Sequence, residues 1–353
     1  MKKHPNYYLF FLVTVLVILG ILFLSTISAS VSMRIFKNTN YFLIHQLYLL
    51  LAGMALAALA YKLPLNYLKK ISPYLLLFNL VLLILVFLPP IGVKFGGANR
   101  WINLGLFTFQ PSELLKITAI LYLAALLSNK RVFIPFLILL AVISLILVLQ
   151  PDVSTLGIIG STLLLMYFFA GTPFWHTVLI FLTAIAGLFA LIKFEPYRFD
   201  RWLIFLHPET DPLGKGLQVK QSLIAIGSGG FFGKGWGMSS QKFGFLPQAM
   251  SDSLFAIWGE ETGIIGSLLL VVLFSFFLLL GVKIAKSSRD SFSQLTAFGI
   301  TFWIIIQTFL NIAANLGILP LAGIPLPFFS YGGSHLVVEL IGVGILLNIS
   351  KNV

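Results

Sequence analysis

The chain of 353 residues contains no cysteine and few charged side chains. Without cysteine it has no disulfide framework and no thiolate metal or redox site. Charged residues make up 10% of the sequence, whereas an ordinary soluble domain carries about a quarter. Hydrophobic residues make up 59% of the chain, which includes 34 Phe. This balance excludes a soluble globular protein.

Apolar segments recur along the whole sequence, and most are long enough to cross about 30 Å of hydrocarbon as a helix. No linker separates one group of segments from another. We therefore expect one all-α integral membrane domain over residues 1–353, a polytopic protein with about ten transmembrane helices and re-entrant or interfacial outer segments. The predicted spans are 7–29, 41–61, 71–89, 112–129, 132–150, 153–171, 175–193, 254–282, 294–318 and 336–350.

Basic residues outnumber acidic ones by 23 to 11, which gives a net charge of +12. In a soluble protein this excess would suggest a nucleic-acid partner. Here the Lys and Arg side chains mostly flank or interrupt apolar segments, where they set orientation and meet lipid phosphates, so we expect no nucleic-acid partner. Those in short loops lie mainly on the side of the N-terminus, and the positive-inside rule therefore places both termini in the cytoplasm.

Three outer segments, 90–112, 194–252 and 319–335, are rich in Gly, Pro and polar residues. Acidic residues are concentrated in these segments or at span boundaries, which locates the chemistry on the outer side. We expect the segments to dip into the membrane face as short re-entrant or interfacial helices, which is permitted where they line a protein cavity. The largest, 194–252, is an extracytoplasmic loop within the single domain.

The first polar motif precedes and opens the span 112–129. Glu113 and Lys116 are three residues apart, so they share one helical face inside the membrane. They could form a mutually satisfied pair that fixes helix packing, or Lys116 could face a polar cavity and hold a substrate phosphate. Arg100 beside Trp101 could be an interfacial anchor or a second phosphate ligand.

The second motif lies in the outer segment 194–252. Its glycine spacing neither follows a strand nor matches a Walker pattern, which excludes a nucleotide-binding loop. Backbone amides and polar or cationic side chains such as Arg201, Gln221 and Lys242 remain, and these can grip phosphate and sugar hydroxyls. Asp252 stands where the segment enters the next span, where it could complement the helix dipole or perform chemistry.

Further polar residues accompany the last three spans. Glu260 and Glu261 lie inside a span, and we expect at least one of them to bind a neighbouring helix or loop. Three prolines within residues 320–327 forbid a regular helix there. His335 and Glu339 are four residues apart and could form a local pair, although they do not by themselves make a metal site.

Four of these motifs resemble those of the SEDS family, which comprises FtsW, RodA and their relatives, and the resemblance covers essentially the whole chain. The run SSQK at 239–242 is closer to FtsW than to RodA. Two departures from the family pattern are Gln248 in place of Glu and His335 in place of a second Ser. The motifs are GANRWI at 97–102, QPSELLK at 110–116, QSLIAIGSGG at 221–230 and PLPFFSYGGS at 325–334.

The resemblance implies a peptidoglycan glycosyltransferase of the bacterial cytoplasmic membrane that polymerises lipid II at the outer leaflet, with a septal, FtsW-like role. It also implies a class B penicillin-binding protein as transpeptidase partner, beside other division or elongation proteins. The alternatives are an elongation-type, RodA-like polymerase, a lipid II flippase, or a scaffold that recruits a transpeptidase.

Asp252 matches the family's essential aspartate, and we hypothesise that it is the general base that activates the acceptor hydroxyl, with inversion at the donor's anomeric carbon. Cationic side chains would hold the diphosphate, with or without a divalent cation such as Mg or Mn. No protein metal site is predicted. The candidate substrate-binding residues are Arg100, Glu113, Lys116, Arg201, Gln221, Lys242, Ser330 and Ser334.

Overall fold

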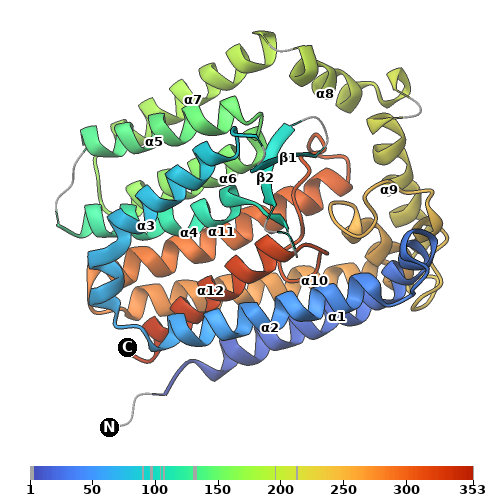
Figure 1. Cartoon of the computed structure of the whole chain (residues 1–353), viewed down its shortest axis with the longest axis horizontal. Coiled ribbons are helices and arrows are strands. Elements are labelled where there is room, and N and C mark those ends of the chain that lie inside the picture. Colours follow the sequence, from blue (N-terminus) through green and yellow to red (C-terminus); the bar gives the residue numbers. More distant parts are fainter. Residues whose placement is uncertain are drawn as a thin grey trace.

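Apolar helices lie roughly side by side in the computed structural model (Figure 1), which describes residues 4–89, 91–95, 98–103, 105, 108–129, 133–194, 196–211 and 214–352. Within these residues, seven helices are long and apolar enough to cross a membrane, and three shorter apolar helices accompany them. Each coincides with one predicted span, which confirms the polytopic all-helical fold. They are α1 (Tyr7–Phe36), α2 (Tyr41–Lys62), α3 (Leu65–Leu85), α4 (Pro111–Asn129), α5 (Phe133–Leu149), α6 (Val153–Phe169), α7 (Phe174–Phe194), α10 (Leu254–Ser287), α11 (Ser291–Asn315) and α12 (Gly333–Ser350).

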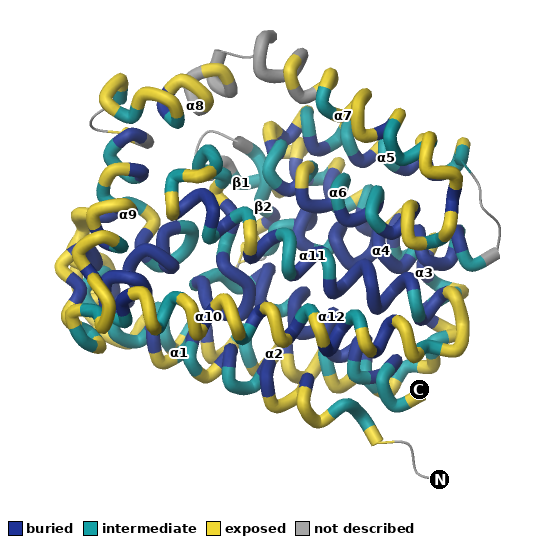
Figure 2. Tube along the Cα trace, turned by 180° about the vertical axis from the view of Figure 1, so that it is seen from behind, coloured by how far each residue is buried: buried dark blue, intermediate teal, exposed yellow. Residues whose placement is uncertain are grey.

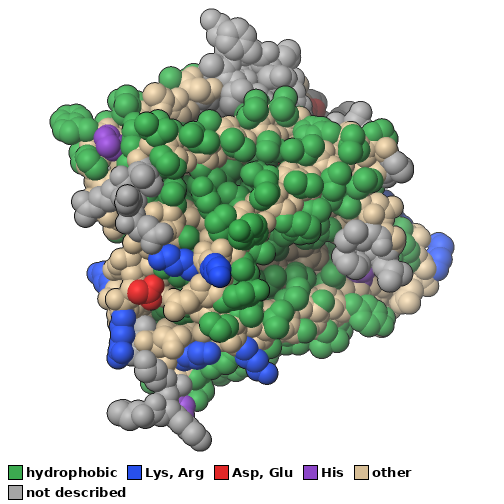
Figure 3. All heavy atoms as spheres, turned by 60° about the vertical axis from the view of Figure 1, so that its left-hand side comes forward, with side chains coloured by type: hydrophobic (Ala, Val, Ile, Leu, Met, Phe, Trp, Pro, Cys, Tyr) green, Lys and Arg blue, Asp and Glu red, His purple; other side chains and the backbone are tan. Residues whose placement is uncertain are grey.

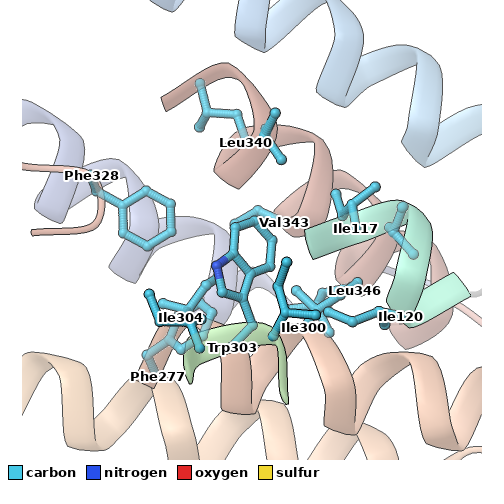
Figure 4. Packing of buried hydrophobic residues seen from close by; sticks show 14 of the residues in the cluster. Ile117, Ile120, Phe277, Ile300, Trp303, Ile304, Phe328, Leu340, Val343 and Leu346 are labelled. Carbon is cyan, nitrogen blue, oxygen red and sulfur yellow. The ribbon is translucent and has the colours of Figure 1, made fainter. Parts of the chain in front are cut away.

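The most buried helices, α4, α11 and α12, form the middle of the bundle, while α2, α3 and α7 expose much of their surface (Figure 2). The indole of Trp303 on α11 is almost fully buried. Around it pack aliphatic side chains of α4 and α12, together with Phe277 of α10 and Phe328 (Figure 4). Helices that are apolar on every face are typical of segments in contact with protein on one side and lipid on the other.

Both chain termini lie at the same end of the bundle, called here the terminal end. The amide of Asn6 donates to Ser350 Oγ at 2.9 Å, and Lys351 Nζ donates to the carbonyl of Tyr61 at 3.0 Å. On the face that Figure 3 shows, Lys and Arg side chains gather near one edge, beside a broad apolar surface. The shared location of the termini agrees with an even number of spans. The exposed basic residues of the terminal end include Lys62, Lys70, Lys283, Lys286 and Arg289.

The opposite end, called the loop end, holds the polar outer segments. At the loop end, β1 (Gly92–Phe95), β2 (Ala98–Asn103) and β3 (Thr108–Phe109) form an antiparallel sheet in that order. Gly92 pairs with Ile102, and Ile102 pairs with Phe109. The expectation of short helices in 90–112 is therefore wrong.

The outer segment 194–252 does form helices, as expected. It contains α8 (Pro196–Leu206), a 3-10 turn at Pro208–Thr210, α9 (Lys215–Gly229) and a second 3-10 turn at Gln241–Phe243. Figure 1 shows α8 and α9 along the edge of the molecule remote from the termini. The third outer segment has no helix between residues 319 and 332, because its prolines cannot sustain one. The expectation of a short re-entrant or interfacial helix in this segment is therefore wrong as well.

Candidate active site

Asp252 lies at the loop end, two residues before α10 begins, and it is partly buried. Its carbonyl oxygen accepts hydrogen bonds from Nδ2 of Asn311 and Nδ2 of Asn315, each at 2.9 Å. Its carboxylate lies beside Gly323, where an added Cβ would be 3.6 Å from Oδ2. The φ of +65° at position 323 lies in the left-handed region that favours glycine, so the chain can turn beside the carboxylate.

The residues on either side of Asp252 are also fixed by other parts of the chain. The Met250 carbonyl accepts the Tyr331 amide at 2.8 Å, and the Ser251 carbonyl accepts the Ser330 hydroxyl at 2.6 Å. Gln218 of α9 donates through Nε2 to Ser253 Oγ at 2.9 Å. The short segment 250–253 thus has contacts from α9, from α11 and from residues 319–332, called here the proline-rich segment, so its backbone is held in one place.

Helix α2 supports the proline-rich segment from the other side. Gln46 donates through Nε2 to the Ser330 carbonyl at 3.5 Å and accepts the Gly332 amide at 3.2 Å. The Tyr331 phenol lies 3.0 Å from Nδ1 of His45. Burial raises the pKa of Tyr331 to about 12, so the phenol stays protonated at neutral pH and can donate to the imidazole.

Glu113 and Lys116 form a buried ion pair within α4. Lys116 Nζ lies 2.9 and 2.8 Å from the two carboxylate oxygens of Glu113, and 2.8 Å from Oε1 of Gln307. The side chains of Lys116 and Glu113 are only 2% and 6% exposed. An ammonium has three hydrogens to donate, and here each finds a protein acceptor. This arrangement favours the packing role over phosphate binding.

Gln307 connects this pair to the proline-rich segment. Its Nε2 donates to the Pro325 carbonyl at 3.1 Å and to Oε1 of Glu339 at 3.4 Å. Glu339 accepts the Phe328 amide at 2.8 Å and lies 3.3 Å from Nδ1 of His335. The predicted pairing of His335 with Glu339 is thereby confirmed. The buried polar network holds Pro325 and Phe328 in place.

Arg100 of β2 reaches the turn between α5 and α6. Its guanidinium donates to the carbonyls of Gln150, at 3.0 Å, and Pro151, and it lies 3.9 Å from the Asp152 carboxylate. Ser154, in the first turn of α6, donates to the Ala322 carbonyl at 2.5 Å, next to Gly323. Arg100 is therefore linked through α6 to the segment that borders Asp252, and its side chain remains 25% exposed.

The other predicted substrate-binding residues are more scattered. Ser330 is buried, and its hydroxyl accepts the Leu326 amide at 2.9 Å while it donates to Ser251. Ser334 Oγ accepts the Gln110 amide at 3.0 Å. Gln221 is half-buried on α9. Arg201 belongs to α8, and its side chain lies outside the part of the chain that the structure describes.

Glu260 and Glu261 organise the segment between α9 and Asp252. Glu260 accepts from Lys234 Nζ at 2.6 Å and from the hydroxyl and amide of Ser240 at 3.0 and 3.3 Å. Glu261 accepts the Gly237 amide at 2.7 Å and lies 3.7 Å from Nζ of Lys242. Both glutamates bind the neighbouring loop, as expected for at least one. Lys242 is directed into this loop and is itself buried.

Gly233 allows this loop to lie directly on α10, and its replacement tests the packing. Its φ is +81°, and an added Cβ would lie 2.1 Å from the Glu261 carbonyl oxygen. We expect Gly233→Ala to lower the free energy of unfolding by about 1–3 kcal/mol or more, because left-handed backbone strain adds to a clash with backbone. Thermal unfolding in detergent measures this. Gly227→Ala, in α9 with open space around it, is the control and should unfold at or above the wild-type temperature.

The described residues contain no group of three or more His, Asp or Glu that could hold a metal ion. Mg²⁺ is usually bound by one or two carboxylates together with substrate phosphates and water. The side chains of the described residues therefore do not build a divalent-cation site by themselves.

The residues that sequence reasoning missed are the carboxamides of α11. Gln307, Asn311 and Asn315 recur at every fourth position of a mostly apolar span, so they share one helical face. This four-residue spacing is the signal by which the sequence could have revealed the three carboxamides. It predicts a buried polar face, although it does not reveal which groups the face binds.

Comparison with known proteins identifies the family. The model of the FtsW, RodA and SpoVE family, described as "Cell cycle protein", matches residues 7–353. Stage V sporulation protein E of Bacillus subtilis is 38% identical over 360 residues, which cover 99% of this chain and 98% of that protein. The probable peptidoglycan glycosyltransferase FtsW of Coxiella burnetii is 38% identical over 348 residues, which cover 95% of this chain and 93% of that protein.

Solved structures agree with this assignment. A chain from the work "Structural coordination of polymerization and crosslinking by a peptidoglycan synthase complex" has a TM-score of 0.81 and 30% identity, with 98% of each chain covered. The rod shape determining protein RodA of Thermus thermophilus has a TM-score of 0.73 and 27% identity, with 98% of this chain and 97% of that chain covered. The protein is thus a multi-pass membrane protein that belongs to the SEDS family of FtsW, RodA and SpoVE.

Proposed function

We propose that the protein is an inverting peptidoglycan glycosyltransferase that polymerises lipid II at the outer leaflet, with Asp252 as general base. The observation that carries this proposal is the fixed, partly exposed position of Asp252 at the loop end. Its carbonyl is held by two carboxamides, and its carboxylate borders Gly323. The names of the relatives support the reaction class: several are probable peptidoglycan glycosyltransferases called FtsW.

The chemistry needs only one carboxylate for proton transfer. Lipid II carries its disaccharide on a polyprenyl diphosphate, so the leaving group departs as an anion that needs charge stabilisation and no proton. Asp252 accepts the proton of the acceptor's GlcNAc 4-hydroxyl as that oxygen attacks the donor's anomeric carbon and the bond to the diphosphate breaks. Attack opposite the leaving group inverts the configuration.

Arg100 and Arg201 are our preferred ligands for the diphosphate. Arg100 is partly exposed and is linked through α6 to the segment beside Asp252. Lys116 and Lys242 are themselves buried, with side chains 2% and 7% exposed, whereas the Arg100 side chain is 25% exposed beside Asp152. A planar guanidinium also binds phosphate oxygens in pairs, which an ammonium does not do.

The distribution of basic residues predicts how the protein lies in the membrane. The terminal end, with its Lys and Arg side chains, would face the cytoplasm, and the loop end would face outward. We propose a septal, FtsW-like role and a class B penicillin-binding protein as partner. A peptidoglycan synthase complex among the similar structures supports an assembly of this kind.

Labelled lipid II and the purified protein in detergent provide the test, with and without the transpeptidase partner. We expect glycan strands, because detergent has no sidedness and a polymerase needs no second compartment. A flippase would give no polymer in detergent but would move lipid II across vesicle membranes. That outcome, or the absence of polymer with every partner tried, would contradict the proposal.

A further inference from the structure

One face of α11 carries a side-chain amide at every fourth residue toward the loop end. The three residues, Gln307, Asn311 and Asn315, are called here the amide ladder, and they are at most 2% exposed. Residues four apart lie above one another on a helix. The ladder therefore forms a continuous row of buried hydrogen-bond donors that points at two other segments of the chain.

Two members of the ladder, Asn311 and Asn315, donate hydrogen bonds to main-chain carbonyls near the Asp252 carboxylate. Asn311 Nδ2 donates to the carbonyl of Asp252 at 2.9 Å and to that of Ile324 at 2.7 Å. Asn315 Nδ2 donates to the same Asp252 carbonyl at 2.9 Å. Ile324 follows Gly323, which borders the carboxylate. Asn311 therefore holds both the residue that carries the carboxylate and the backbone beside it.

Two donors on one carbonyl occupy both of its lone pairs. Because both come from one buried helix, they fix the position and direction of the Asp252 carbonyl, and so restrict where the Cα that carries the carboxylate can lie. A general base must lie within hydrogen-bond reach of the proton that it removes. A shift of this carbonyl would move the carboxylate relative to the acceptor hydroxyl and slow the proton transfer.

We propose that Asn311 and Asn315 are positioning residues that aim the Asp252 carboxylate through its main-chain carbonyl. This inference rests on the proposed function. Gln307 extends the ladder by holding the Pro325 carbonyl at 3.1 Å, one residue beyond Ile324. The carboxamides act on the backbone of Asp252, so their loss lowers turnover and leaves the affinity for lipid II nearly unchanged.

Asn311→Asp tests the proposal in the polymerisation assay. The substitution keeps the shape of the side chain and replaces the donated hydrogens by an oxygen that faces two carbonyl oxygens. We expect kcat to fall about 100-fold with little change in KM, the size of effect that a misplacement of about 1 Å produces. Asn315→Ala is the milder variant, since Asn311 still holds the carbonyl, and should lower kcat about tenfold.

Asn348→Asp is the matched control. Asn348 on α12 is also buried and donates through Nδ2 to two main-chain carbonyls, those of Ala60 at 3.0 Å and Leu63 at 2.6 Å. These contacts lie at the terminal end, far from Asp252. The control should lose thermal stability as Asn311→Asp does, while its kcat stays at the wild-type value. Equal losses of kcat in Asn348→Asp and Asn311→Asp would overturn the proposal, as would unchanged kcat in both α11 variants.

A double-mutant cycle separates this inference from the proposed function. Residues that act as a unit give strongly non-additive effects. Asn315→Ala should lower kcat in the wild-type background and have no further effect when Asp252 is already Asn. Equal losses in both backgrounds would show a general structural role and overturn the proposal. If Asp252→Asn alone kept full activity, the assignment of the general base would fail instead.

Discussion

Asp252→Asn is expected to reduce the polymerisation of lipid II by about 10²–10⁴-fold, the usual contribution of a general base. The amide cannot accept the proton of the acceptor hydroxyl, although it has the same shape as the carboxylate. The carbonyl contacts to Asn311 and Asn315 are main-chain contacts and remain possible in the variant. We therefore expect thermal unfolding in detergent close to that of the wild type, with turnover measured by the length and yield of labelled glycan.

Glu209→Gln is the control for this substitution. Glu209 also lies in the outer segment 194–252, but its side chain is 73% exposed and contacts only His207 among the ion pairs of the described residues, at 3.2 Å. Loss of this carboxylate should leave turnover within about twofold of wild type, as is usual for surface changes. Equal activity of Asp252→Asn and wild type would remove Asp252 from the mechanism.

Lys116→Met is expected to destabilise the protein by about 3–5 kcal/mol, because it leaves the Glu113 carboxylate buried without its partner. The lysine side chain is only 2% exposed; its Nζ contacts Glu113 and Gln307 and lies 5.6 Å from the centroid of the Trp303 ring. Thermal unfolding in detergent measures the effect. Lys286→Met, at an exposed position of the terminal end, is the control and should unfold like the wild type.

A double variant distinguishes the packing role of Lys116 from phosphate binding. Glu113→Gln combined with Lys116→Met removes both charges, and replacing a buried ion pair as a whole is often close to neutral. We expect the double variant to regain most of the lost stability and to bind lipid II with a KM near the wild-type value. A stable double variant with a much higher KM would instead assign Lys116 to the substrate.

Transmembrane spans could be predicted because about twenty apolar residues suffice to cross a bilayer. The boundaries depart from hydropathy in places: α3 begins at Leu65, whereas hydropathy predicts residue 71. Lys69 and Lys70 lower the local hydrophobicity there, yet they lie in the first turns of the helix. The three-stranded sheet was missed because strands of two to six residues are too short to show a clear alternation.

Asp252 itself was found by resemblance to a family, since a single acid before a helix could equally be a dipole partner. Its supports could not be found in this way. Asn311 and Asn315 are 59 and 63 residues away from it in the sequence, and only the fold brings them to its carbonyl. Likewise, the sequence left open whether Lys116 faces a cavity, and only the position of Gln307 shows how the ammonium is satisfied.

The side of the membrane on which Asp252 lies tests the account most directly, and the absence of cysteine makes the measurement clean. Ser251→Cys places one thiol beside Asp252, and Ser287→Cys places one at the terminal end, where Ser287 is exposed. In intact cells, a membrane-impermeant maleimide should label Ser251→Cys, and it should label Ser287→Cys only after permeabilisation. The reverse pattern would place the carboxylate in the cytoplasm and contradict polymerisation at the outer leaflet.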